Sequence, residues 1–126
     1  MDPHDPWRKP RPELVDRFHE AVAGIEGLEV RKMFGNPAAF VGGNLTAGGL
    51  HRESFMVRLS EADRAEPLAD GWAPFEPMPG RPMREYVVLP AEVVADADAA
   101  RGWVERAAGY VRTLPPKVPK ARKPAK

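Results

Sequence analysis

Apolar side chains recur along this chain with two different periods, which predict helices and strands. After Pro12, a residue suited to a first helical turn, apolar residues fall at spacings of three and four, as on one face of a helix. They are Leu14, Val15, Phe18, Val22 and Ile25, and the helix-ending residues Gly24 and Gly27 follow. A short second helix is expected after the N-cap Ser60, with Pro67 either kinking or ending it. The last helix, capped by Asp96 or Asp98, is expected to run to about Leu114, with Trp103 on its apolar stripe filling the helix–sheet interface.

Between the helices, apolar and polar residues alternate with the period of two that indicates strands. The first strand is expected from Val30 and resumes to Val41 after a turn or bulge at Gly35-Asn36-Pro37. Gly42-Gly43-Asn44 marks a hairpin, because Gly and Asn tolerate the positive φ of a tight reversal. Further strands are expected at Leu45–Leu50, Phe55–Leu59, Trp72–Phe75 and Met83–Leu89.

These elements follow one another as a helix, three strands, a helix, two strands and a helix. Antiparallel strands with helices gathered on one face predict a two-layer α+β domain with a sheet of about five strands. We expect three regions: an extended arm over residues 1–12, a single domain over residues 13–114, and a basic, disordered tail rich in Pro and Lys over residues 115–126. A chain of 126 residues fits one such domain.

The composition favours a cytoplasmic protein. No stretch approaches the run of about 18 apolar residues that a membrane span needs, and residues 1–7 lack the apolar core of a signal peptide. The chain contains no cysteine, which excludes disulfides and thiolate metal sites. We therefore expect no contact with a membrane.

The net charge of +1 is unevenly distributed. The last twelve residues carry five basic side chains and no acidic ones, so the preceding 114 residues carry a net charge of −4. Four of the lysines recur at every third position, which would line one side of an extended polyproline II rod. Three interpretations stay open for this tail: contact with nucleic acid, contact with an acidic protein surface, or solubility alone. The residues concerned are Lys117, Lys120, Arg122, Lys123 and Lys126.

Motifs for catalysis or cofactor binding are absent from the sequence. His4, His19 and His51 are not separated from one another by a spacing typical of metal ligands. The glycine pairs Gly42-Gly43 and Gly48-Gly49 do not precede a helix as the glycines of a phosphate loop do. We expect no metal, no cofactor and no catalytic residues.

The stretch from residue 74 to residue 90 contains the best polar cluster, formed by Glu76, Arg81, Arg84, Glu85 and Tyr86. One interpretation makes its arginines an anion-binding pair beside a stiff loop, and the other makes them partners of loop carbonyls and of an exposed ion pair. Under the first interpretation, the ligand-binding residues are Glu76, Arg81, Arg84 and Tyr86.

Four segments resemble the TfoX N-terminal-domain family. They are Lys32-Met-Phe-Gly35, Leu59-Ser-Glu-Ala-Asp63, the whole of Pro74–Pro90, and Leu114-Pro-Pro-Lys117 after a helix that carries a tryptophan. The resemblance covers roughly residues 13–117 and implies an α+β fold of the same order. It supplies no catalytic residues, since most members of the family are small stand-alone proteins without an assigned activity.

We therefore expect a non-enzymatic regulatory or protein-interaction module that binds an unknown protein partner and forms a homodimer. Two alternatives stay open. One is weak, non-sequence-specific association of nucleic acid with the tail, and the other is a small-molecule or enzymatic site near residues 76–86.

Overall fold

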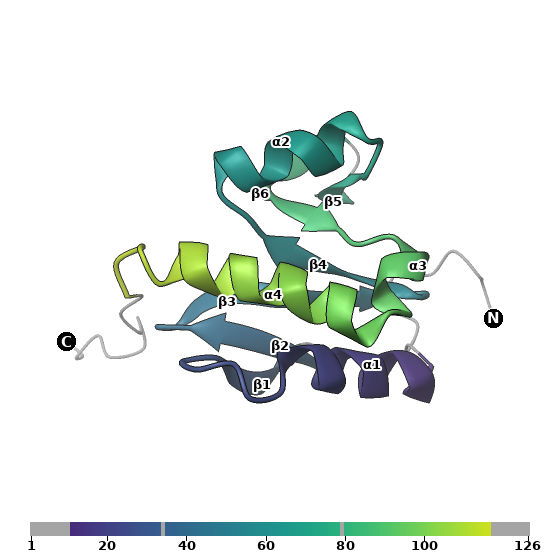
Figure 1. The fold of residues 1–126 in the computed structure, drawn as a ribbon, viewed down its shortest axis with the longest axis vertical. Coiled ribbons are helices and arrows are strands. Elements are labelled where there is room, and N and C mark those ends of the chain that lie inside the picture. Colours follow the sequence, from purple (N-terminus) through teal and green to yellow (C-terminus); the bar gives the residue numbers. More distant parts are fainter. Residues whose placement is uncertain (1–10, 34, 79, 117–126) are drawn as a thin grey trace.

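The computed structural model describes residues 11–33, 35–78 and 80–116, except for the side chains of residues 76–78 and 81–83. Figure 1 shows a twisted sheet with helices packed in front of it. The elements are α1 (Pro12–Val22), β1 (Glu29–Met33), β2 (Asn36–Val41), β3 (Asn44–His51), β4 (Ser54–Arg58), α2 (Glu61–Ala69), β5 (Pro74–Met78), β6 (Arg81–Val88), α3 (Ala91–Val94) and α4 (Ala97–Val111).

The strands form one six-stranded antiparallel sheet in the order β1-β2-β3-β4-β6-β5. The predicted α+β class is confirmed, although the sheet has one strand more than the five expected. The difference lies at Gly35, whose φ of 83° lets the chain reverse so that Met33 pairs with Asn36. The segment expected to be one interrupted strand is therefore a hairpin of two strands.

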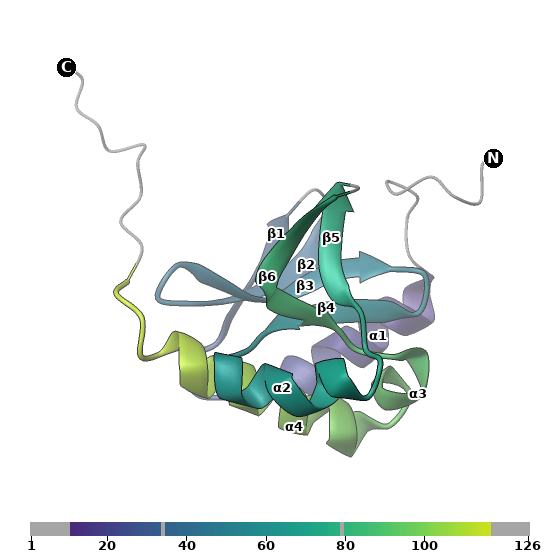
Figure 2. The same ribbon diagram turned by 90° about the horizontal axis from the view of Figure 1, so that it is seen from above.

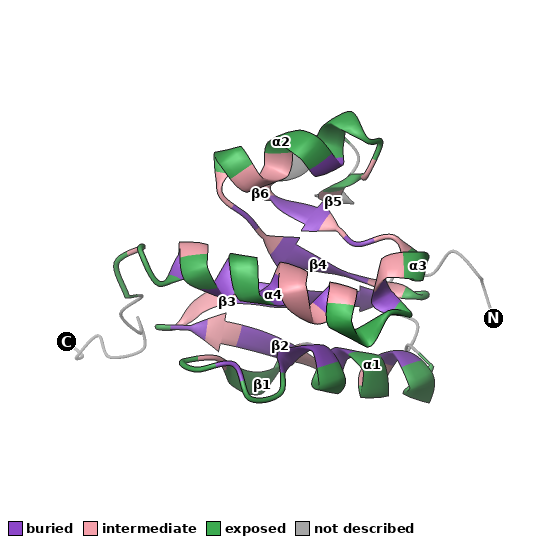
Figure 3. Cartoon of the chain, viewed as in Figure 1, coloured by how far each residue is buried: buried purple, intermediate pink, exposed green. Residues whose placement is uncertain are grey.

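The helices lie together on one face of the sheet, below the strands in Figure 2. α4 packs on β3 and β4, and α1 packs beside α4. Alternate strand residues point into this layer, as the period of two requires. Figure 3 shows buried residues along the inner strands and at intervals along α1 and α4. The largest fully buried side chains of this core are Phe18, Phe55, Leu59, Leu89, Val57, Val87, Val94, Val104 and Val111.

Helix ends follow the capping residues predicted from the sequence. The Ser60 hydroxyl accepts from the N–H of Asp63 at 3.2 Å, and Asp96 caps α4 by accepting from the N–H of Ala99 at 3.2 Å. Pro67, which was expected either to kink this helix or to end it, does not end it, because α2 continues to Ala69. A proline at this position removes one hydrogen bond within the helix, and the next turn still forms.

Arg101 on α4 and Arg112, the residue that follows the helix, hold the connection between α1 and β1. Arg101 donates to the carbonyl oxygen of Ala23, and Arg112 donates to the carbonyl oxygen of Glu26. The bonded residues are 78 and 86 positions apart in the sequence. The last helix therefore fixes the path by which the chain leaves the first one.

Trp103 lies beside the helix–sheet interface, where it is only half-buried. Its ring makes an edge contact with Trp72 at 5.1 Å between centroids, and the Arg106 guanidinium lies 4.7 Å from the ring centroid. The next residue, Val104, occupies the interior position. Trp103 therefore packs against the margin of the core, and its neighbour Val104 fills the interior of the helix–sheet interface.

The last residues described lie against the β2–β3 hairpin. Asn44 Nδ2 donates to the carbonyl oxygen of Pro115 at 3.0 Å. Across the described ranges, no helix is both long enough and apolar enough to cross a membrane.

Candidate functional site

The residues predicted to bind a ligand lie on the β5–β6 hairpin. Tyr86 is buried, with 8% of its surface exposed, whereas Arg84 two positions earlier is exposed. Glu76 belongs to β5 and Arg81 begins β6, and the side chains of both lie outside the described part of the structure. The structure thus places Tyr86 in a polar network with residues other than the three predicted partners.

Other candidates from the sequence are scattered or fall outside the described ranges. The tail residues Lys117, Lys120, Arg122, Lys123 and Lys126 all lie outside them, as does His4. His19 is exposed on α1, and His51 Nε2 accepts from Arg52 Nε at 3.3 Å. Within the described ranges, the side chains form no group of three or more metal-ligand residues.

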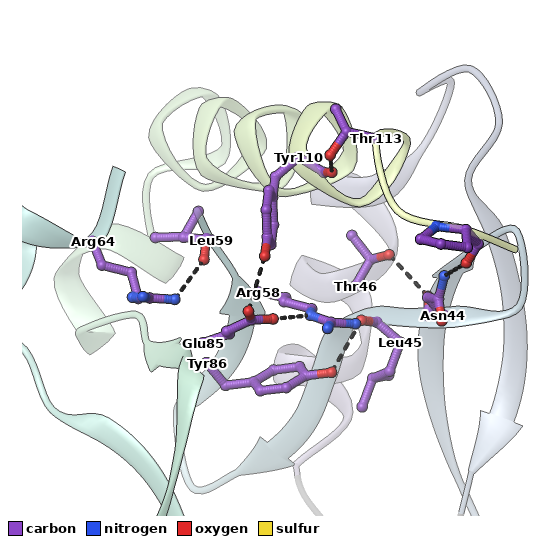
Figure 4. A network of polar contacts seen from close by, with 11 residues as sticks. Asn44, Leu45, Thr46, Arg58, Leu59, Arg64, Glu85, Tyr86, Tyr110 and Thr113 are labelled. Atoms are coloured by element: carbon purple, nitrogen blue, oxygen red, sulfur yellow. Dashed lines mark hydrogen bonds and ion pairs between the residues drawn. The ribbon is translucent and has the colours of Figure 1, made fainter. Parts of the chain in front are cut away.

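An ion pair between neighbouring strands lies at the centre of the network around Tyr86. Arg58 on β4 and Tyr86 on β6 are directly opposite each other in the sheet. The Arg58 Nε donates to Glu85 Oε1 at 2.7 Å, and its guanidinium lies 5.6 Å from the centroid of the Tyr86 ring. Figure 4 shows the arginine between this carboxylate and the aromatic ring. The side chains are 21% exposed for Arg58 and 37% for Glu85, so water reaches part of the pair.

Two phenol groups extend the network to other elements. The Tyr110 hydroxyl, on α4, donates to Glu85 Oε2 at 2.9 Å. The Tyr86 hydroxyl donates to the backbone carbonyl oxygen of Leu45, on β3, at 3.3 Å. These four side chains, Arg58, Glu85, Tyr86 and Tyr110, are called the Arg58–Glu85 network below. It joins the sheet to its helical layer and spans three strands.

Electrostatics keeps the carboxyl group of the network ionised. Burial alone would raise the pKa of Glu85, because it disfavours the charged form. The hydrogen bonds from Arg58 and Tyr110 outweigh that effect, and the charge of Arg64 on α2 adds to them, so the pKa of Glu85 is lowered. Burial likewise opposes the charge of Arg58 and is the largest single cause, but the bond to Glu85 and the electrostatic interactions with Tyr86, Glu85 and Tyr110 together outweigh it, so the pKa of Arg58 is raised.

The two phenols are held in their neutral form. Burial is the largest cause that raises the pKa of Tyr86, and the charge of Arg58 opposes it only in part. Burial and the hydrogen bond to Glu85 both raise the pKa of Tyr110. At neutral pH the network therefore carries one carboxylate, one guanidinium and two neutral phenols. A general acid or base has its pKa tuned toward the working pH, and every shift here is in the opposite direction.

Arg58 and Tyr110 are the members of the network that the sequence did not indicate. Arg58 is 27 residues from Glu85, and Tyr110 is 25 residues from it. Tyr110 counts as part of the apolar stripe of α4, and its hydroxyl meets the carboxylate only because α4 packs over the sheet. One signal was present, since Arg58 is the polar residue in an otherwise apolar strand end.

A shallow groove of about 230 Å³ lies where the start of α1 meets the β3–β4 turn. Arg11 and Glu53 form an exposed ion pair across it at 3.5 Å. Charges of both signs line the groove, so it does not favour an anion or a cation. Its lining residues are Arg11, Glu13, Leu14, Arg17, Arg52 and Glu53.

The sheet face opposite the helices carries a second apolar group, which we call the uncovered face because the helices lie on the other side of the sheet. Three of its residues, Ala38, Met56 and Tyr86, are nevertheless buried, with 0%, 2% and 8% of their surface exposed. Along each strand, its side chains alternate with those that face the core. Phe40 on β2 lies opposite Leu45 on β3, and Met56 on β4 lies opposite Val88 on β6. Phe40 and Leu45 are half-buried, and the Arg31 guanidinium lies 5.2 Å from the centroid of the Phe40 ring. The residues of this face are Ala38, Phe40, Leu45, Met56, Tyr86 and Val88.

Comparison with known proteins identifies a family and no individual relative. The family model described as the TfoX N-terminal domain matches residues 20–110, which include every strand and most of the helical layer. No curated protein matches the chain, and no solved structure matches it. Because the match spans well over half of the 126 residues, this chain belongs to the TfoX N-terminal domain family.

Proposed function

We propose that this protein is a cytoplasmic, non-catalytic interaction module that binds another protein through the uncovered face of its sheet. The observation that carries the proposal is the half-buried pair Phe40 and Leu45 on that face. Aromatic and aliphatic side chains flanked by arginines are typical of protein-binding surfaces, and here Arg31 and Arg58 lie beside the apolar group. Under this proposal, the protein would act as a regulator by binding its partner protein.

The Arg58–Glu85 network supports binding over catalysis. Both carboxylate oxygens of Glu85 accept hydrogen bonds, one from Arg58 and one from Tyr110. The shifts in pKa stabilise the protonation states that exist at neutral pH, the carboxylate of Glu85 and the neutral phenol of Tyr110, and so they oppose proton transfer. The contacts with Arg58 and Leu45 hold Tyr86 in place on the uncovered face, and a preorganised surface loses less entropy when it binds.

Photo-crosslinking tests the proposal. A benzophenone-bearing phenylalanine derivative replaces Phe40 in one variant and the exposed Arg17 of α1 in a control variant. Proteins attached at position 40 but not at position 17 are then purified and titrated against the wild-type chain. We expect Phe40→Ser to weaken that binding at least tenfold, about 1.4 kcal/mol. Equal crosslinking at both positions, or unchanged binding by Phe40→Ser, would overturn the proposal.

A ligand site near residues 76–86 is a second proposal, motivated by Arg84, whose exposed side chain lies on the same strand face as Tyr86. Thermal-shift screening of small anions is the direct test. A ligand at about 100 times its Kd adds about 2.7 kcal/mol to the free energy of unfolding. Arg84→Ala should remove the shift, and a shift that persists in Arg84→Ala would place the ligand elsewhere.

A further inference from the structure

The two edges of the sheet differ in their capacity to pair with another strand. The edge strand β5 contains Pro74 and Pro77, which have no N–H to donate, and proline is a common means of blocking a sheet edge. The other edge strand, β1, has no proline, and four of its five residues are exposed. Val30 on β1 is 40% exposed, the largest value for a large apolar side chain in the described ranges. β1 is therefore the open edge.

The outward backbone groups of β1 follow from the turn that ends it. Two residues separate the paired Met33 and Asn36, and a two-residue hairpin is closed by a hydrogen-bonded pair. Hydrogen-bonded and non-hydrogen-bonded pairs alternate from there, so Lys32 and Val30 point their N–H and C=O groups away from β2. The pairing of Lys32 with Pro37 agrees, since a non-hydrogen-bonded pair needs no N–H from the proline. Val30 thus presents both a side chain and a donor–acceptor pair at the free edge.

We propose that two copies of this chain form a homodimer by antiparallel pairing of β1 with β1, centred on Val30. In this register, Val30 of each copy exchanges two hydrogen bonds with Val30 of the other. Glu29 of each copy then lies opposite Arg31 of the second copy, in a close, non-hydrogen-bonded pair on the uncovered face. Glu29 and Arg31 already lie 3.1 Å apart within one chain, so the two pairs combine into an alternating ring of four charges.

Charge selects this register over its neighbours. Centring on Arg31 would place the two Arg31 guanidinium groups opposite each other, and centring on Lys32 would do the same with two ammonium groups. Like charges directly opposite each other destabilise a sheet. Only the Val30-centred register among these three makes both charged cross-strand pairs attractive. The two-fold axis then stands perpendicular to the sheet, so the helical layers of both copies lie on the same side of one continuous sheet.

Analytical ultracentrifugation of the full chain at concentrations from about 1 μM to about 1 mM measures the fraction of dimer and its Kd. Val30→Pro removes the outward N–H while leaving the bonds to β2 in place, and we expect it to raise the dimer Kd at least tenfold. Val30→Thr keeps the N–H and the branched shape, so this matched control should dimerise as the wild type does. A wild-type chain that stays monomeric throughout the range, or Val30→Pro that dimerises normally, overturns the proposal.

Charge reversal keeps the proposal testable if Val30→Pro does not fold. Glu29→Arg places four positive charges at the interface, and Arg31→Glu places four negative charges there. Each variant alone should therefore be monomeric at concentrations where the wild type is dimeric. An equimolar mixture should form a heterodimer, because every cross-strand pair becomes attractive again. A mixture that remains monomeric contradicts the proposal, since the ion pair within each chain is equally absent before and after mixing.

The register has its own test, because the chain contains no cysteine. A hydrogen-bonded pair places its Cα atoms about 5.5 Å apart, within the range of about 4.4–6.8 Å that a disulfide spans. Mild oxidation should therefore crosslink Val30→Cys into a covalent dimer. In Arg31→Cys, the two sulfur-bearing residues are offset by two positions, and about 8 Å separates their Cα atoms. Crosslinking of Arg31→Cys in place of Val30→Cys would refute the Val30-centred register.

Discussion

Removing the Tyr110 hydroxyl is the sharpest perturbation of the Arg58–Glu85 network. Tyr110→Phe keeps the ring on α4 and deletes the O–H that donates to Glu85 Oε2 at 2.9 Å. A hydrogen bond to a charged group contributes about 1.5–3 kcal/mol, but Glu85 is 37% exposed and water replaces part of the lost bond. We therefore expect Tyr110→Phe to lower the free energy of unfolding by about 1 kcal/mol at neutral pH.

The loss should depend on pH, because the acceptor is a carboxylate with a lowered pKa. A group whose pKa is lowered by folding stabilises the protein above its unfolded pKa, about 4.3 for Glu, and loses that contribution as the pH falls through the folded value. Glu85 is neutral at pH values below both pKa values, so the wild type and Tyr110→Phe should then differ by less than about 0.5 kcal/mol. Urea unfolding followed by tryptophan fluorescence, at neutral pH and at a pH below both pKa values of Glu85, measures both differences.

Tyr86→Phe is the matched control for this experiment. It also deletes one phenol hydroxyl, but that hydroxyl donates to the carbonyl oxygen of Leu45, which does not titrate. We expect a loss of about 1 kcal/mol for Tyr86→Phe that is similar at both pH values. If Tyr110→Phe showed the same pH-independent loss as Tyr86→Phe, the assignment of a charged acceptor to Tyr110 would be refuted.

Four further predictions concern the core, a tryptophan pair, a turn and the tail. Phe18 is fully buried, and its ring centroid lies 5.0 Å from that of Phe55. Phe18→Ala should therefore lower the free energy of unfolding in urea by about 3–5 kcal/mol, and a loss below about 1 kcal/mol would show that Phe18 does not lie on the core-facing side of α1. A double-mutant cycle of Trp72→Ala and Trp103→Ala should give a coupling of about 0.5–1.5 kcal/mol, and additive losses would exclude a specific ring contact. Gly35 has a φ of 83° with no atom near an added Cβ, so Gly35→Ala should cost about 1–2 kcal/mol through backbone strain alone, and Gly35→Asn should cost less. Deleting residues 117–126 should abolish retention on immobilised DNA at about 50 mM salt if the tail contacts phosphates, and retention that survives deletion excludes that role.

The periodicity of apolar residues was sufficient to predict the helices and most of the strands. The apolar stripe of α1 and the alternation in β4 each indicate which residues face the core, and Phe18 and Val57 are buried as expected. The hairpin at Gly35 was missed because Asn36-Pro37 resembles a break in a strand. In the sheet, the pair of Pro37 with Lys32 on β1 needs no N–H, and the register pairs no residue of β3 with Pro37 on the other side, so a proline is tolerated within β2.

The candidate site was less predictable than the fold. Tyr86 was singled out by its place in a distinctive stretch, but its partners come from β4 and α4. Sequence separation conceals Arg58 and Tyr110, since nothing local to Glu85 indicates which cation or phenol will reach it. Only the order β4-β6 in the sheet and the packing of α4 bring them together.

The bonds from Arg101 and Arg112 to the connection after α1 also have a consequence for protein synthesis. The carbonyl oxygens of Ala23 and Glu26 leave the ribosome early, whereas their donors are 78 and 86 residues further along the chain. The first helix therefore reaches its final position only after the last helix has been translated. Until then its apolar face lacks α4, and a nascent chain stalled before residue 97 would present that face to chaperones.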